Sequence, residues 1–152
     1  GQTLDFYDCL TGNLSLPRKV FLDASGFDEA FIGYGWEDID LGIRLIKKGK
    51  MTMRYAERAE NYHFHVWTET QEWQRRFKMG QSVGGILTKH PSLKYFLGVH
   101  FINRIIYFLV LIVPKWRKLA NSALSDDNVP RFKRWLFREY YYQLGIISSK
   151  RV

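Results

Sequence analysis

The sequence predicts a mostly helical α+β fragment with a few short strands, followed by a helical C-terminal region. Three stretches have apolar residues at helical spacing, at 36–48, 68–90 and 130–144. Only the stretch 50–65 favours extended structure, as one or two short strands. The chain has 152 residues, of which 46% are hydrophobic, so the composition suffices for a folded core.

The first helices are indicated by the residues at their ends. A short helix is expected over 18–24, because Pro17 suits a first helical turn and Gly26 suits the position after a last one. A loop with several glycines follows. The helix over 36–48 is expected to end at Gly49, where a glycine commonly terminates a helix.

The stretch 68–90 has the clearest helix boundaries in the sequence. Thr68 or Thr70 can cap its N-terminus, and Pro91 ends it. Three glycines within it permit bends or the close approach of another segment: Gly80, Gly84 and Gly85.

The stretch 93–118 is the most hydrophobic part of the chain, and two interpretations of it stay open. Its uninterrupted apolar run, 105–113, is too short to span a bilayer. It is either a buried helix or a helix lying in the plane of a membrane interface, with the basic and aromatic residues of 115–118 at the headgroups. The last predicted helix, 130–144, is basic and carries an apolar stripe that comprises Phe132, Trp135, Leu136 and Tyr140.

Charge is distributed unevenly along the chain. Residues 1–62 contain 8 Lys and Arg against 10 Asp and Glu, whereas residues 63–152 contain 15 against 5. A basic second half can face nucleic acid, an anionic membrane or an anionic ligand. No nucleic-acid-binding motif is present, so we expect no nucleic acid partner. The single Cys9 excludes a disulfide within the chain and a cysteine-based zinc site.

Three carboxylates, Glu37, Asp38 and Asp40, lie together at the start of the helix over 36–48. Asp40 precedes Arg44 by four residues, a spacing that predicts an intrahelical ion pair. Glu37 and Asp38 occupy the first turn, where exposed backbone N–H groups favour negative charge. That position alone explains either acid, but it also suits a general base.

Aromatic residues adjoin these acids. Tyr34 and Trp36 precede them in the glycine-rich loop. Aromatic faces beside carboxylate acceptors suit sugar rings, which have apolar C–H faces and hydroxyl groups that need hydrogen-bond partners. Further along, His63 and His65 alternate and can share one face of a strand, which indicates either ordinary histidines or part of a divalent metal site.

The order of several motifs resembles the C-terminal half of the catalytic domain in family 2 glycosyltransferases of the GT-A fold, and especially a galactosyltransferase-type segment. The motifs are G-N-x-S at 12–15, G-F-D-E at 26–29, G-W-E-D-x-D at 35–40, R-L-x-x-x-G at 44–49 and Y-H at 62–63. The resemblance covers roughly residues 10–91 and implies two parts. Residues 1–91 are expected to be the acceptor-side half of an α/β GT-A domain, and residues 92–152 a basic, aromatic-rich helical extension.

The resemblance also implies roles for individual residues. Asp38 matches the family's catalytic base, and Trp36 and Glu37 match acceptor-binding positions. Tyr34 joins the acceptor-binding set because of its aromatic face. Gly12 and Asn13 match a loop that lies against the donor sugar. His63, rather than His65, matches a position that binds metal in several relatives.

The implied reaction moves a sugar from a nucleotide-sugar donor to a hydroxyl group of a glycan or lipid-linked acceptor, with inversion at the anomeric carbon and with Mn²⁺ or Mg²⁺ as cofactor. The donor-binding half of the family, with its D-x-D motif, is not present before Gly12, so the chain is expected to be a piece of a longer protein and inactive alone. We expect a cytoplasmic location, peripheral on an anionic membrane. The alternative is a catalytically silent membrane-docking or assembly module of the same fold.

Overall fold

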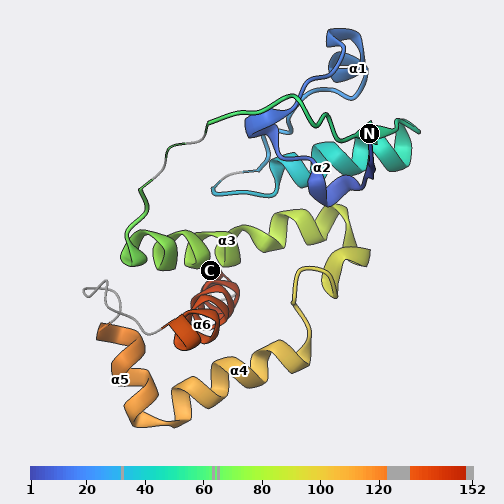
Figure 1. Ribbon diagram of the computed structural model, residues 1–152. Coiled ribbons are helices and arrows are strands. Elements are labelled where there is room, and N and C mark those ends of the chain that lie inside the picture. Colours follow the sequence, from blue (N-terminus) through green and yellow to red (C-terminus); the bar gives the residue numbers. More distant parts are fainter. Residues whose placement is uncertain (32, 63, 65, 123–130, 150–152) are drawn as a thin grey trace. The chain divides into compact units, whose positions relative to one another are not determined.

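A computed structural model of the protein describes residues 1–31, 33–62, 64, 66–122 and 131–149 (Figure 1). Most of them are helical and only two short strands occur among them, in agreement with the predicted mostly helical class.

The chain forms two compact units. The first contains Gly1–Phe31 and Gly35–Phe64, and the second contains Ile32–Tyr34 and His65–Val152. The boundary between the two units thus lies before the long helix α3 (Glu69–Lys89), whereas the sequence predicted a domain boundary at residue 91. That domain boundary stays a prediction.

The first unit is built around the helix that carries the acidic motif. It contains β1 (Thr3–Leu4), η1 (Phe6–Asp8), η2 (Thr11–Asn13), α1 (Arg18–Asp23), α2 (Glu37–Ile43), the π-helical turn η3 (Arg44–Lys48) and β2 (Met53–Arg54). The predicted helix over 36–48 is confirmed, as α2 continued by η3, and Gly49 ends it. β1 pairs antiparallel with β2, and this partner strand was not predicted.

A glycine allows α2 to pack closely on η1. The position that a Cβ of Gly42 would occupy is 2.7 Å from Cys9 Cβ and also meets the carbonyl oxygen of Phe6. Both Cys9 and Phe6 are buried, and so is Leu41 of α2. The last turn of α2 is thus held against η1 and Cys9 through a contact that no side chain at position 42 would permit.

The second unit is a set of helices in which α6 is central. It contains α3 (Glu69–Lys89), η4 (Pro91–Lys94), α4 (Phe101–Ile112), α5 (Pro114–Ser122) and α6 (Arg131–Ser149). In Figure 1, α6 lies between α3 and α4, and α5 follows α4. The core of the unit consists of Trp73, Val110, Ala120, Phe137, Tyr140 and Tyr141.

The stripe predicted for the last helix is only partly correct. Tyr140 is buried, but Trp135 is 65% exposed. The side of α6 that packs on α3 is defined by Phe137, Tyr141 and Gly145, which recur every four residues. The side chain of Phe132 lies outside the described residues.

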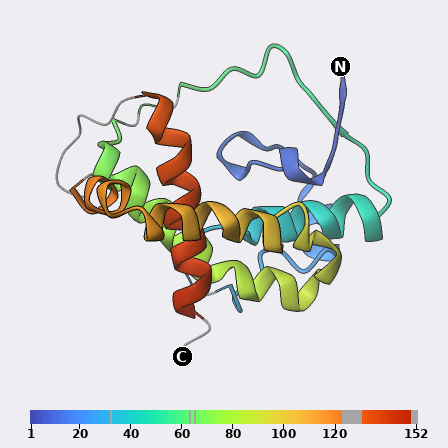
Figure 2. The same cartoon turned by 90° about the horizontal axis from the view of Figure 1, so that it is seen from below.

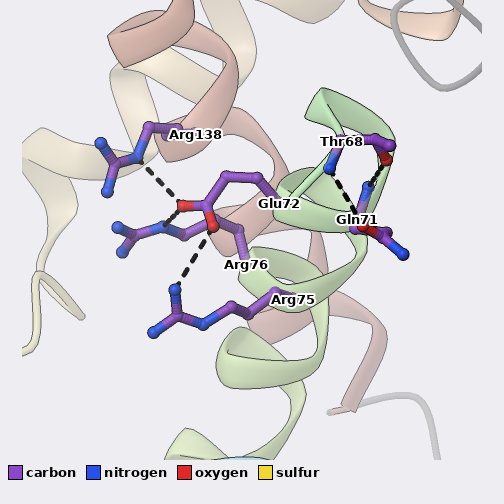
Figure 3. Close-up of polar contacts among 6 residues, drawn as sticks. All are labelled: Thr68, Gln71, Glu72, Arg75, Arg76 and Arg138. Atoms are coloured by element: carbon purple, nitrogen blue, oxygen red, sulfur yellow. Dashed lines mark hydrogen bonds and ion pairs between the residues drawn. The ribbon is translucent and has the colours of Figure 1, made fainter. Parts of the chain in front are cut away.

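Helix α3 begins as predicted and is tied to α6 by charge. Thr68 caps it in a reciprocal arrangement, with Thr68 Oγ1 accepting from Gln71 N and Gln71 Oε1 accepting from Thr68 N (Figure 3). One turn later, Glu72 pairs with the arginines of its own helix and with Arg138 of α6 at 3.5 Å (Figure 3). Arg134 of α6 pairs with Glu69 at 2.9 Å.

The hydrophobic stretch 93–118 forms two helices instead of one buried helix. Val113 has an extended backbone (φ −85°, ψ 106°), and Pro114 begins α5. Only one side of α4 is buried, as Val110 shows, whereas Phe101 and Ile112 at its ends are more than 70% exposed. The interpretation as a buried helix therefore holds only for the side of α4 that contains Val110. In the described parts of the chain, no helix has the length and apolar character needed to cross a bilayer.

The buried tyrosines of α6 predict a loss of stability at alkaline pH. Burial raises the pKa of Tyr141 and Tyr142 well above the usual value near 10, and the hydroxyl group of Tyr142 donates to the Leu97 carbonyl at 2.8 Å. Above pH 10 the unfolded chain therefore releases protons that the folded chain retains. For each such tyrosine, the free energy of unfolding is expected to fall by about 1.4 kcal/mol per pH unit.

Urea unfolding followed by circular dichroism at pH values above 9 measures this slope. Tyr142→Phe removes one titrating group and is expected to make the slope shallower, although it also lowers stability at neutral pH because the hydrogen bond to Leu97 is lost. Tyr95→Phe, at a 78% exposed position, serves as the matched control. An unchanged slope in Tyr142→Phe would contradict the prediction.

Candidate functional site

The entry into α2 has an unusual backbone. Gly35 has φ +83°, and Trp36 has φ +79°, a value that residues with a side chain seldom adopt. Trp36 is also the N-cap of α2, and its carbonyl oxygen accepts from Asp40 N at 2.9 Å. For a residue with a side chain such a conformation costs on the order of 1–3 kcal/mol; Ser25 and Lys50 also adopt it here, and it recurs at binding and catalytic sites. The residue that directly precedes the acidic motif is thus one of the strained positions of the backbone.

Asp38 lies in the first turn of α2 and is half-buried. Its Oδ1 accepts from Ile39 N at 3.0 Å, and it forms no ion pair with any residue that the structure describes. Burial raises the pKa of the Cys9 thiol, and the negative charge of Asp38 raises it further. The carboxylate of Asp38 thus lies close enough to Cys9 to act on it electrostatically.

Asp38 shares a helix face with residues that border a cavity. Gly42 follows it by one turn, and both lie on the same side of α2. A cavity of about 410 Å³ in the first unit is bordered by Gly42, Cys9 and Asn13, but neither Asp38 nor Trp36 is among its lining residues. Asp38 therefore lies on the cavity-facing side of α2, at its N-terminal end.

Asp40 has a structural role, as its spacing predicted. It is buried, and its Oδ2 accepts from Arg44 Nε at 2.8 Å. Arg44 also donates through Nη1 to the carbonyl oxygen of Ala24, just after α1. The predicted ion pair is confirmed, and it connects the end of α1 to α2.

Gly12 and Asn13 are held to the segment after β2 by two hydrogen bonds. Asn13 Nδ2 donates to the Ala59 carbonyl at 2.8 Å, and Asn61 Nδ2 donates to the Gly12 carbonyl at 2.9 Å. The asparagine of the G-N motif thus positions its own turn beside the cavity.

Glu37, which directly precedes Asp38 in the first turn of α2, is half-buried.

Tyr34 belongs to the second unit, whereas the other predicted acceptor-binding residues, Trp36 and Glu37, and the predicted base Asp38 belong to the first. The Arg75 guanidinium lies over the Tyr34 ring, 5.5 Å from its centroid, and 6.0 Å from the ring centroid of Trp67. Ser82 Oγ donates to the Tyr34 carbonyl at 2.8 Å. Sequence reasoning missed Trp67 and Arg75. The sequence offered only a weak signal for them: Trp67 directly precedes the helix cap Thr68, and Arg75 belongs to an arginine pair two helical turns later.

The predicted metal ligands His63 and His65 lie outside the described residues. Within the part of the chain that the structure does describe, no three His, Cys, Asp or Glu side chains gather closely enough to hold a metal ion. These residues by themselves therefore do not fit a bound divalent ion.

The arrangement of motifs agrees with comparisons to known proteins. Residues 2–70, which contain the candidate site, match the family described as the N-terminal domain of galactosyltransferase. Among individual proteins, an uncharacterized glycosyltransferase of Bacillus subtilis, YfnE, is 43% identical over 54 residues, which are 36% of this chain and 14% of that protein. The validoxylamine A glucosyltransferase of Streptomyces hygroscopicus subsp. jinggangensis is 36% identical over 84 residues, which are 55% of this chain and 19% of that protein.

No solved structure matches the chain. The aligned regions span less than a fifth of the relatives' lengths. The predicted resemblance to glycosyltransferases is confirmed, since residues 2–70 are similar to the galactosyltransferase family and parts of the chain are similar to individual glycosyltransferases.

Proposed function

We propose that the chain is the acceptor-side portion of an inverting glycosyltransferase of the GT-A fold, with Asp38 as its general base. The observation that supports this proposal is that two acids at the start of α2 differ in their partners. Asp40 forms an ion pair with Arg44. Asp38 forms no ion pair with the described residues and follows the strained turn at Trp36. An ionised carboxylate in such a position can accept a proton from a hydroxyl group.

The proposed chemistry is a single displacement. The acceptor oxygen attacks the anomeric carbon of the donor sugar, and its proton passes to the carboxylate of Asp38. The bond between the anomeric carbon and the diphosphate oxygen breaks, and the electron pair leaves with the nucleotide. Trp36 and Glu37 hold the acceptor in line, because correct positioning contributes several kcal/mol to a displacement of this kind.

Other residues are proposed to complete the two substrate sites. Asn13, which borders the 410 Å³ cavity, and the adjacent Gly12 face the donor sugar. Tyr34 offers an aromatic face to the acceptor, and its backbone is held by Ser82. The donor is a nucleotide-sugar, and the acceptor is a glycan or a lipid-linked hydroxyl compound.

A divalent ion, Mn²⁺ or Mg²⁺, would supply positive charge to offset the charge on the leaving diphosphate. Because the described residues do not gather a ligand set, we assign most of its ligands to a donor-binding half outside this chain, with His63 as the contribution of this chain. A Mn²⁺ titration of the 152-residue chain followed by water proton relaxation is expected to show weak binding, which His63→Ala removes. Tight binding by the chain alone would contradict this assignment.

The 152-residue chain alone is expected to show no sugar transfer. Incubation with UDP-sugars, Mn²⁺ and a panel of glycan and lipid-linked acceptors tests this expectation, since real turnover by the isolated chain would overturn it. Joining a donor-binding half before Gly1 is expected to restore transfer. If the joined protein binds donor and acceptor but transfers nothing, the chain is instead the catalytically silent module of the same fold, an alternative that the exposed apolar side of α4 favours.

A further inference from the structure

Helix α4 has two opposite sides with different environments. Its inner side meets α6, where Asn103 Nδ2 donates to Glu139 Oε1 at 3.1 Å and the Tyr107 ring stacks on Tyr140 with 5.4 Å between centroids. Val110 on the same side is fully buried. The spacing of these three inner residues is helical, so they define a single stripe along α4.

The outer side of α4 is apolar and exposed. Its large hydrophobic side chains are each at least 42% exposed; they are Phe101, Ile102, Ile105, Phe108, Leu109 and Ile112. In Figure 2 α4 passes in front of α6, so this view faces the side of α4 that is turned away from α6. We call these six residues the outer face. A contiguous apolar surface of this kind marks an interaction site.

The charge around the outer face has one sign. Residues 93–122 contain no Asp or Glu, and their five basic residues are Lys94, Arg104, Lys115, Arg117 and Lys118. Arg104 flanks the outer face on α4, and the three on α5 are exposed. Aromatic residues lie at both ends, because Tyr95 precedes the face and Trp116 follows it, both exposed. Trp and Tyr concentrate where a membrane meets water.

A hollow adjoins the N-terminal end of the outer face. It has a volume of about 630 Å³, and its lining includes Lys94, His100 and Arg104 beside Tyr95 and Phe101. Basic side chains at the edge of an apolar surface suit an anionic headgroup whose acyl chains lie on that surface.

We propose that α4 binds in the interface of an anionic membrane, with the outer face among the acyl chains and the basic residues among the headgroups. A helix of this length extends about 18 Å, which is shorter than the hydrocarbon core of about 30 Å, so α4 lies in the membrane plane. A second copy of the chain is a poorer occupant, because pairing two such faces would bring two sets of five basic residues together.

Flotation of the 152-residue chain with phosphatidylcholine vesicles, with and without phosphatidylglycerol, tests the proposal. Binding is expected only with the anionic lipid and is expected to weaken as salt is raised. Phe108→Asp is expected to lower the partition coefficient by about 10-fold or more, because it places a charge in the middle of the outer face. The control, Leu22→Asp on α1, replaces a side chain of similar exposure, 53% against 49%, and is expected to bind as the unchanged chain does.

The charge contribution has its own matched pair of variants. Replacing Arg117 and Lys118 with glutamine is expected to lower the partition coefficient by about fivefold for each residue. The same change at Lys48 and Lys50, which are exposed in the first unit, is expected to leave it unchanged. Equal losses in both pairs would show that net charge alone drives binding, which would overturn the assignment to α4.

Quenching by brominated lipid gives a readout that needs no folding-sensitive variant in α4. The indole of Trp116 is expected to be quenched on anionic vesicles, and Trp116→Phe is expected to remove most of the quenching, whereas Trp135→Phe retains it. Absence of vesicle binding, equal binding to neutral vesicles, or a dimer in sedimentation that Phe108→Asp dissociates would each overturn the proposal. Because none of these measurements involves sugar transfer, they stand apart from the test of Asp38.

Discussion

Replacing Asp38 with asparagine is expected to lower kcat of sugar transfer by about 10² to 10⁴-fold in a protein that joins this chain to a donor-binding half. Asparagine keeps the shape of the side chain but cannot accept the acceptor proton. Because Asp38 forms no ion pair with the described residues, the fold is expected to persist. Steady-state kinetics that separate kcat from KM measure the effect, and KM for the acceptor is expected to change little.

Two neighbouring acids are the controls for this variant. Glu37→Gln is expected to raise the acceptor KM more than it lowers kcat. Asp40→Asn breaks the buried pair with Arg44 and is expected to lower the free energy of unfolding by about 3 kcal/mol or more, which appears as a lower Tm. If Glu37→Gln abolishes kcat while Asp38→Asn retains it, the general base is Glu37 and the proposed role of Asp38 is wrong.

The charge of Asp38 also has a readout in the 152-residue chain that does not depend on activity. Since the carboxylate adds to the raised pKa of the Cys9 thiol, Asp38→Asn is expected to lower that pKa. Burial is the larger cause, so the pKa of Cys9 is expected to stay above its usual value in the variant. A pH titration of the Cys9 Cβ resonance by NMR measures the difference, and an unchanged titration would show that Asp38 does not act on Cys9.

Replacing Gly145 with alanine is expected to destabilise the second unit by about 1–3 kcal/mol or more. A Cβ at Gly145 would overlap with the carbonyl oxygen of Phe77 in α3, and a Cβ at Gly80 would overlap with the carbonyl oxygen of Tyr142 in α6. The two backbones cross at these glycines, and backbone atoms cannot move aside as a flexible side chain can. Chemical unfolding followed by circular dichroism measures the loss.

Gly84 provides the matched control within α3. Nothing lies within 4 Å of the position that its Cβ would take. Gly84→Ala is therefore expected to stabilise the helix by about 0.5–1 kcal/mol, the ordinary gain of alanine over glycine inside a helix. If Gly145→Ala and Gly84→Ala change stability alike, the close crossing of α3 and α6 does not exist as described.

The features that the sequence predicted correctly depend on neighbours within one or two helical turns. Thr68 and Gln71 cap α3 through contacts three residues apart, and Gly49 ends the helix that continues α2. Asp40 and Arg44 pair because they are four residues apart. Local backbone geometry determines such contacts, so spacing alone suffices to predict them. The resemblance to glycosyltransferases also came from the order of short motifs.

By itself, then, the sequence determined the helices α1, α2 and α3, the cap of α3 and the acidic motif with its resemblance to glycosyltransferases, but not the break between α4 and α5 or the end of α6 at Ser149. Only the tertiary structure decided that β1 pairs with β2, that Gly80 and Gly145 allow α3 and α6 to cross, that Tyr34 lies beside Arg75, and that one side of α4 is exposed. Each of these depends on residues far apart in the chain. Hydrophobic burial is not directional, so periodicity shows that a helix has an apolar side but does not show what covers that side.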